Sequence, residues 1–185
     1  MDIIAKRLME LSKAIEDMDI SNLYHVAVKI GTVAHKGGTI YVCGNGGSAA
    51  TASHFKNDLE KFGCAKADTK LKVVCLNDNI PIMTAVANDI SYDDIFSFQI
   101  DKRLKPDDLL IAISTSGNSK NIIQAVNCAH RHHIKVIGMT GGNGGQLKSL
   151  ADLLLHTNIE GAANIEDIHS IMCHTIATVL NEILK

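Results

Sequence analysis

Apolar residues follow a helical spacing at the start of the chain. They recur every three or four positions from Ile3 to Ile15, and again from Leu23 to Ala34. Ser21 is the expected N-cap of the second stretch, and the glycine pair at 37–38 ends it. The pattern therefore predicts two helices before any strand.

Short apolar runs then alternate with further helical patterns. The expected strands are Ile40 to Cys43, Leu71 to Leu76, Asp108 to Ile113, Lys135 to Met139 and Asp152 to His156. Buried strands that alternate with helices are typical of a parallel sheet covered on both faces. We therefore expect an α/β fold with a doubly wound parallel five-stranded sheet flanked by helices, of the flavodoxin-like or Rossmann-like type.

The chain length of 185 residues suits one domain. Residues 1–36 are expected to serve packing or oligomerisation, and residues 37–185 to form the α/β core with a closing helix. The sequence contains no Pro- or Ser-rich linker and no internal repeat.

Charge and hydropathy exclude several classes of partner. The net charge of −2 gives no electrostatic footprint for nucleic acid. No apolar run approaches the length of a membrane span, and residues 1–7 lack the order of a signal peptide. We expect a cytoplasmic protein with neither nucleic-acid nor membrane partners.

The five cysteines are scattered and contain no C-x-x-C pair, which favours buried free thiols over disulfides or a metal cluster. They are Cys43, Cys64, Cys75, Cys128 and Cys173.

Two turns carry the main chemical signal. Residues 44–48 read Gly-Asn-Gly-Gly-Ser directly after the first strand, and residues 114–119 read Ser-Thr-Ser-Gly-Asn-Ser directly after the third. A glycine turn that leads into a helix presents backbone N–H groups to an anion, and the second turn adds four hydroxyls. Both turns follow strands, so they are expected at one edge of the sheet, lining one phosphate-binding pocket.

Nucleotide sites fit these turns poorly. The serine turn contains no lysine, whereas a Walker motif requires Gly-Lys-Ser/Thr. Gly44, Gly46 and Ala49 match the dinucleotide fingerprint, but the acidic residue expected about 20 positions on is only Asp68, before the next strand. A third glycine-rich turn at residues 140–145 carries one hydroxyl and is more simply a flexible turn into a short helix.

These motifs together resemble a known family. The two turns, the Ala-Asn-Asp segment at residues 87–89 and the late segment Ile-Glu-Asp-Ile-His at residues 165–169 are similar to the sugar isomerase (SIS) domain of phosphoheptose isomerases. The resemblance extends over nearly the whole chain. Each motif alone is weak or moderate, but their order and spacing are specific.

The resemblance implies reversible conversion of sedoheptulose 7-phosphate into D-glycero-D-manno-heptose 7-phosphate, which supplies heptose for surface sugars such as lipopolysaccharide or capsule. It also implies a homotetramer with active sites between subunits. The phosphate is expected in the serine turn. The residues expected to contact the substrate are Asn45, Gly46, Gly47, Ser48, Asn88, Asp89, Ser114, Thr115, Ser116, Ser119 and Glu166.

An aldose–ketose isomerase needs an acid and a base and no redox cofactor. His54 and Asp58 lie four residues apart, on one face of the expected helix. By resemblance, Asp58 takes the position of the family's general acid/base and His174 that of its histidine partner. The resemblance also places one zinc ion per chain on His54, Asp58, Glu166 and His174.

The chain departs from the family pattern at three points. Asp58 replaces the usual Glu, Glu166 replaces the usual Gln, and an arginine expected after Asp58 is missing, with Lys61 nearby. Glu166 and His174 are eight residues apart, or about 12 Å along a helix, which is too far for one ion. A site shared by two subunits, or a helix that begins after Glu166, would remove this conflict.

Three classes of function follow. The first is a sugar-phosphate isomerase. The second is a non-catalytic SIS module that senses a sugar phosphate or binds a protein such as a replication initiator, although such an adaptor needs no acid/base or metal residues. The third is a nucleotide-binding domain, which tight binding of NAD or ATP would reveal.

Overall fold

The computed structural model describes residues 2–61 and 71–184. Cys64 and Asp68 lie outside the described residues. The helices are α1 (Asp2–Glu16), α2 (Ile20–His35), α3 (Gly47–Lys61), α4 (Ile80–Asp89), the 3₁₀ helix η1 (Tyr92–Asp94), α5 (Ser97–Ile100), α6 (Lys120–Arg131), α7 (Leu147–Leu150) and α8 (Ala162–Ile183). The strands are β1 (Thr39–Cys43), β2 (Lys72–Cys75), β3 (Leu109–Ile113), β4 (Lys135–Gly141) and β5 (Leu153–Thr157).

The five strands form one parallel sheet in the order β2-β1-β3-β4-β5. Ile40 of β1 pairs with Val73 of β2 on one side and with Leu109 of β3 on the other. This is the flavodoxin-like strand order. β2 is added on one side of β1 and β3 on the other, so the strand order reverses between β1 and β3. The expected fold class is confirmed, with each strand within two residues of its predicted limits.

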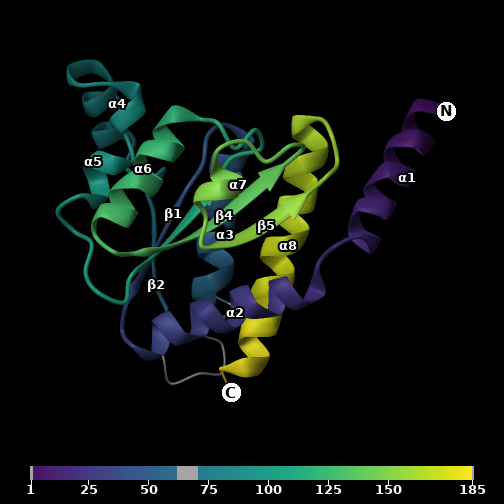
Figure 1. The fold of residues 1–185 in the computed structure, drawn as a ribbon, viewed down its shortest axis with the longest axis horizontal. Coiled ribbons are helices and arrows are strands. Elements are labelled where there is room, and N and C mark those ends of the chain that lie inside the picture. The colour runs from purple at the N-terminus through teal and green to yellow at the C-terminus, as the bar shows by residue number, and fades with distance from the viewer. Residues whose placement is uncertain (1, 62–70, 185) are drawn as a thin grey trace.

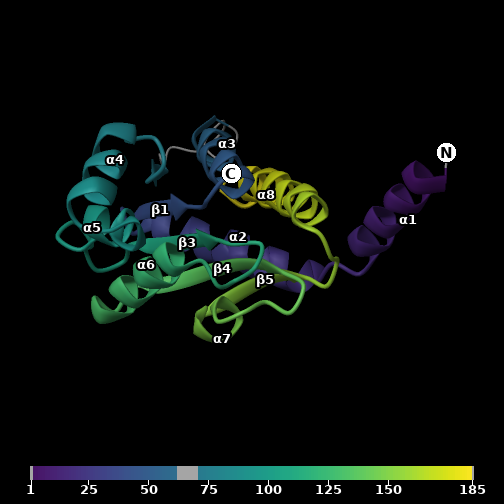
Figure 2. The same ribbon diagram turned by 90° about the horizontal axis from the view of Figure 1, so that it is seen from above.

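Helices cover both faces of the sheet (Figure 2). α2, α3 and α8 share one apolar core with alternate strand residues such as Val42 and Ile111, while α4, α5, α6 and α7 share the other core with residues such as Tyr41 and Leu110. All residues of β3 are buried, because this central strand meets apolar side chains on both faces.

The first helix stands apart from this layered body. Figures 1 and 2 show α1 extending away from the sheet, and none of its residues is buried. Its link to the body includes an ion pair between Arg7 and Asp167 of α8. Within the described residues, no helix is both long and apolar enough to cross a membrane.

The N-cap of α2 differs from the prediction. Helix α2 begins at Ile20, and its cap is Asp19, whose carboxylate accepts a hydrogen bond of 2.9 Å from the Asn22 backbone N–H. The expected cap, Ser21, lies inside the first turn. Both residue types cap helices, so the position is decided by which of them the preceding turn leaves in an extended conformation.

The described cysteines are buried free thiols, as predicted: Cys43, Cys75, Cys128 and Cys173. Burial raises the pKa of the Cys75 thiol to about 11, which keeps it protonated and unreactive near neutral pH.

Candidate active site

The two phosphate-type turns meet at the point where the strand order reverses. The turn after β1 leads into α3 through Gly46, whose φ of +53° favours glycine. The turn after β3 leads into α6 through Gly117, with φ of +63°. Since β1 and β3 are hydrogen-bonded neighbours, both turns lie at the ligand-binding edge of an open α/β sheet.

Two side-chain amides link the two turns by hydrogen bonds. Asn45 donates to Asn121 over 2.8 Å, and Asn121 donates back to the Asn45 oxygen over 2.9 Å. The Tyr92 hydroxyl also donates to that oxygen over 3.2 Å. Sequence reasoning missed Asn121 and Tyr92, because neither belongs to a recognised motif and only the fold brings them to Asn45.

The serine turn is tightly folded around its first hydroxyl. Ser114 Oγ accepts a hydrogen bond from the Gly117 N–H at 3.1 Å and lies 3.2 Å from Ser119 Oγ. Ser119 is the N-cap residue of α6, yet its side chain makes no capping hydrogen bond. The start of a 12-residue helix and several hydroxyls are therefore available together, which suits an anion such as phosphate.

A hollow of about 560 Å³ opens beside the serine turn. Thr115, Ser116 and Asn118 form one wall, residues 141–143 of the third glycine turn form another, and residues 160–162 with Ile165 at the start of α8 complete it. The backbones of Gly117 and Gly144 pack directly against each other, because a Cβ on Gly117 would overlap the Gly144 carbonyl oxygen. The third glycine turn thus supports the serine turn and lines the same hollow.

Three potential acid/base groups meet between α3 and α8. His54 Nε2 lies 2.9 Å from His174 Nε2, and Asp58 Oδ2 lies 3.4 Å from each of these nitrogens. The two imidazoles are 57% exposed, whereas the Asp58 side chain is 4% exposed. A buried carboxylate under two accessible imidazoles can move protons to and from a ligand that lies on top of them.

The same three residues have the geometry of a metal site. Two ligands held about 2.0 Å from a tetrahedral ion are about 3.3 Å apart, and the three measured separations lie between 2.9 and 3.4 Å. Asp58 Oδ2 is buried and has no hydrogen-bond partner among the described residues. An unpaired carboxylate oxygen beside two imidazole nitrogens fits a divalent cation.

Glu166 does not join this group in one chain. Helix α8 begins at Ala162, so Glu166 and His174 share one continuous helix, and a helix that begins after Glu166 is excluded. The Glu166 carboxylate lies against Gly47 at the start of α3, where a Cβ would overlap it. The group within 4.8 Å consists of His54, Asp58 and His174 without Glu166.

Asn88 and Asp89 lie at the C-terminal end of α4, apart from the two turns in sequence. They are exposed, and the Asn88 amide donates to the Asp89 carboxylate over 2.7 Å. Tyr92, three residues later, is the residue of this segment that contacts Asn45. Lys61 is the last residue of α3.

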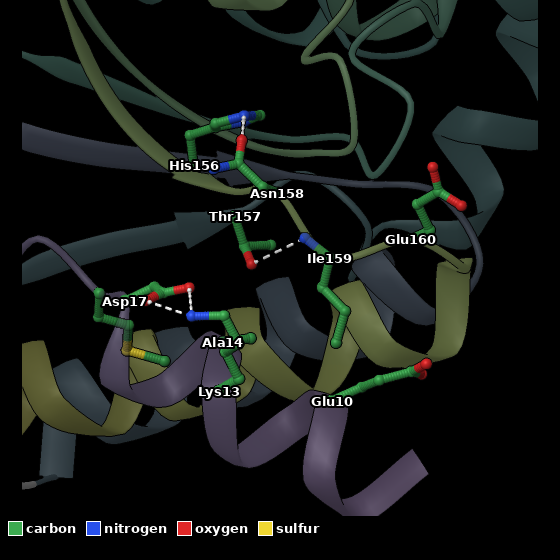
Figure 3. Close-up of a pocket in the computed structure, with 10 residues that line it drawn as sticks. Glu10, Lys13, Ala14, Asp17, His156, Thr157, Asn158, Ile159 and Glu160 are labelled. Carbon is green, nitrogen blue, oxygen red and sulfur yellow. Dashed lines mark hydrogen bonds and ion pairs between the residues drawn. The ribbon is translucent and has the colours of Figure 1, made fainter. Parts of the chain in front are cut away.

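Another hollow, of about 460 Å³, lies between α1 and the segment after β5 (Figure 3). Several of its polar groups already have near partners: Lys13 pairs with Asp17, and the His156 ring hydrogen-bonds Asn158. None of the expected site residues lines it. The chemistry therefore points to the edge of the sheet and not to this hollow.

Comparison with known proteins gives a consistent result. Residues 5–141 match the model of the SIS domain family. A probable phosphoheptose isomerase from Thermoplasma acidophilum is 38% identical over 177 residues, which cover 96% of this chain and 97% of the relative. A phosphoheptose isomerase from Helicobacter pylori is 36% identical over 90% of this chain and 85% of its own length.

A solved structure has the same fold throughout. The phosphoheptose isomerase from Neisseria gonorrhoeae superposes with a TM-score of 0.88 at 30% sequence identity. The match covers 98% of this chain and 96% of that one.

Proposed function

Because the chain belongs to the phosphoheptose isomerase family of SIS-domain proteins, we propose that it interconverts sedoheptulose 7-phosphate and D-glycero-D-manno-heptose 7-phosphate. The observation that carries the proposal is the convergence of His54, Asp58 and His174 on α8 and on α3, the helix that begins at the same sheet edge as the serine turn. One end of such a site suits the phosphate, and the other suits the carbonyl end of the sugar.

The reaction moves hydrogen between two neighbouring carbons. A base removes a proton from C1 of the ketose while an acid protonates the C2 carbonyl oxygen, which gives an enediol. A proton is then delivered to C2, and the hydroxyl on C1 loses its proton, so that C1 becomes the aldehyde. The oxidation of C1 and the reduction of C2 balance each other, so no redox cofactor is needed. General acid/base groups provide such transfers with rate gains of roughly 10² to 10⁴.

Asp58 and His174 are the proposed catalytic residues. The His174 ring is exposed and can reach a sugar, and the buried Asp58 carboxylate holds or accepts the proton that the ring exchanges. His54 contacts both groups from α3 and holds their orientation. Asp58 is one methylene shorter than Glu, which keeps its carboxylate close to α3, and the two histidines extend toward the substrate.

The phosphate is proposed to bind the serine turn, with Ser114, Thr115, Ser116 and Ser119 as hydroxyl donors at the start of α6. Asn45, Gly46, Gly47 and Ser48 would face the sugar, while Asn88, Asp89 and Glu166 would complete the substrate contacts. The amide pair between Asn45 and Asn121 supports this arrangement by keeping the two turns in register.

As the alternative to direct proton transfer by Asp58 and His174, we infer that His54, Asp58 and His174 hold one zinc ion. Two imidazoles and a carboxylate form a ligand set that zinc accepts and leave a fourth position open. When bound, such an ion supplies Lewis-acid polarisation of the substrate carbonyl. Glu166 would act as a further ligand only from a neighbouring subunit or after a movement of α8.

A homotetramer with shared active sites is proposed from the surface of α1. Ile3 is 84% exposed, Met9 72% and Leu8 58%, so one helix presents a row of apolar side chains to solvent. A hollow of about 520 Å³ between α1 and α8 is lined by Leu8, Ile15 and other residues and reaches His174. A second copy that covers α1 would therefore border the catalytic cluster.

The function is tested by incubating the protein with ketose phosphates of five, six and seven carbons and measuring aldose phosphate formation, with and without a chelator. We expect conversion of the seven-carbon sugar without added NAD or flavin, and loss of activity after chelation that zinc restores. Activity that is the same with and without the chelator would contradict the zinc assignment and support direct acid/base catalysis by Asp58 and His174. Binding without turnover of any sugar would favour a non-catalytic sensor.

A further inference from the structure

A second group of metal-binding side chains lies on the opposite face of the sheet from His54 and His174. It consists of Asp101, Cys128 and His132, whose ligand atoms all lie within 4.8 Å of one another. Cys128 belongs to the apolar core under α5 and α6, whereas α3 and α8 border the other core. The group is therefore separate from the proposed active site.

The local sequence sets up this geometry. Cys128 and His132 are four residues apart at the C-terminal end of α6, so their side chains lie on one face. Asp101 is the C-cap residue of the adjacent helix α5. The serine turn is at the other end of α6, about 13 Å from Cys128 along the helix axis.

The two separations from Asp101 match those of ligands around one small ion, and the third pair, Cys128 and His132, lies within 4.8 Å. His132 Nε2 lies 3.1 Å from Asp101 Oδ1, and Cys128 Sγ lies 3.4 Å from the same oxygen. Ligands about 2.0 to 2.3 Å from a tetrahedral ion are about 3.3 to 3.6 Å apart. An ion could therefore be bound with little movement of the backbone.

Solvent access and charge also suit a metal ion. The side chains of Asp101 and His132 are 49% and 38% exposed, which leaves room for a water molecule as a fourth ligand. A thiolate and a carboxylate together would balance a 2+ charge. The competing cation is the exposed Arg131 guanidinium, 4.0 Å from Asp101, which can turn outward.

The ligand types select the metal. One sulfur, one nitrogen and one oxygen ligand suit zinc, whereas magnesium and calcium prefer oxygen alone. Burial and the neighbouring Asp101 raise the pKa of the Cys128 thiol to about 11. The metal must therefore displace the thiol proton, and its affinity will increase with pH.

We propose that Asp101, Cys128 and His132 bind one zinc ion, with an open fourth position, at a site that links the end of α6 to the end of α5. This site does not depend on the proposed isomerase activity. Because the ion would bind the folded chain and not the unfolded one, zinc raises the melting temperature through it.

The test is titration of the metal-free protein with Co²⁺ alone. A sulfur-to-cobalt charge-transfer band in the near ultraviolet reports a thiolate ligand, which the cluster of His54, Asp58 and His174 does not offer. We expect the band in the parent protein and in a His54→Ala variant, and its absence in Cys128→Ala. No band in the parent protein, or a band that persists in Cys128→Ala, would overturn the proposal.

His132→Ala is the second variant, because this half-exposed residue can be removed without opening the core. We expect the Co²⁺ dissociation constant of the charge-transfer site to rise at least about 100-fold, since losing even an outer-shell partner costs roughly 10- to 100-fold. The increase in melting temperature caused by zinc through this site should disappear with it. Unchanged cobalt affinity in His132→Ala contradicts the assignment.

Discussion

At the scale of single residues, the proposed chemistry depends on a carboxylate that is buried while its neighbours are exposed. Asp58 faces the interior between α3 and α8, and His54 and His174 lie between it and solvent. The relation between His54 and Asp58 was predictable, because a spacing of four places both on one helix face. That His174 meets them from 116 residues beyond Asp58 was implied only by family resemblance.

Other residues at the site had no signal in the sequence. Asn121 lies two positions after the serine turn and Tyr92 lies in a short 3₁₀ helix, and both reach Asn45 only because β1 and β3 are neighbours. A single sequence contains no measure of such a distance. Glu166 is a case in which the sequence did give a warning. Its separation of eight residues from His174 is too large for the two to share one ion, and the structure places its carboxylate against Gly47.

His169 gives a prediction about stability and pH. It is fully buried on α8, with no ring hydrogen bond among the described residues, and burial lowers its pKa to about 4. The unfolded chain takes up a proton near its ordinary pKa of 6.5, and the folded chain does so only near 4. Stability from this residue is therefore complete above pH 6.5 and is lost as the pH falls toward 4, by about 3 kcal/mol in all.

The measurement is urea unfolding of the parent protein and a His169→Phe variant between pH 4 and 7. Phe fills a similar space and does not titrate, so its free energy of unfolding should fall less steeply with acid. Parallel curves for the two proteins would show that His169 does not contribute to the acid sensitivity.

At the scale of elements, alternation of apolar runs was enough to identify all five strands and their parallel arrangement. Strands buried on both faces must be continuously apolar, and such runs are easy to recognise. Helix ends were less certain, as Asp19 and Ser21 illustrate, because several residues can cap and the turn before them decides.

The turn after β3 gives a second prediction. Gly117 has positive φ, and a Cβ there would overlap the Gly144 carbonyl, whereas Gly142 has φ of +56° but open space around it. Gly142→Ala should cost about 1 to 2 kcal/mol from backbone conformation alone. Gly117→Ala should cost more and also raise KM for the sugar phosphate, because the serine turn must move.

Thermal unfolding and steady-state kinetics of the two glycine variants separate these effects. Equal losses of stability with unchanged KM in both would mean that contact between the third glycine turn and the serine turn is unimportant for binding.

At the scale of the whole molecule, α1 is the part that one chain alone does not explain. No residue of α1 is buried in the monomer, and its apolar side chains border the hollow that reaches His174. The leading apolar pattern predicted a helix for packing, but a helix that packs on its own domain and one that packs on another subunit have the same pattern. The proposed tetramer accounts for its exposure.

A substitution on α1 tests this account. Leu8→Asp should lower the mass in solution from about four times 19.9 kDa toward that of smaller species, and activity should fall with it. Ile80→Asp is the matched control, since Ile80 is 66% exposed on α4 and should leave the assembly intact. If sedimentation velocity gives the parent protein the mass of a single chain, 19.9 kDa, the tetramer is ruled out.

The most direct test of the central claim is the rate at which sedoheptulose 7-phosphate becomes an aldose phosphate in the parent protein, Asp58→Asn and His174→Ala. The proposed acid/base roles predict turnover by the parent protein and a decrease of roughly 10² to 10⁴ in kcat for each variant, with the fold intact. Turnover in both variants equal to that of the parent, or none in the parent, would contradict the account.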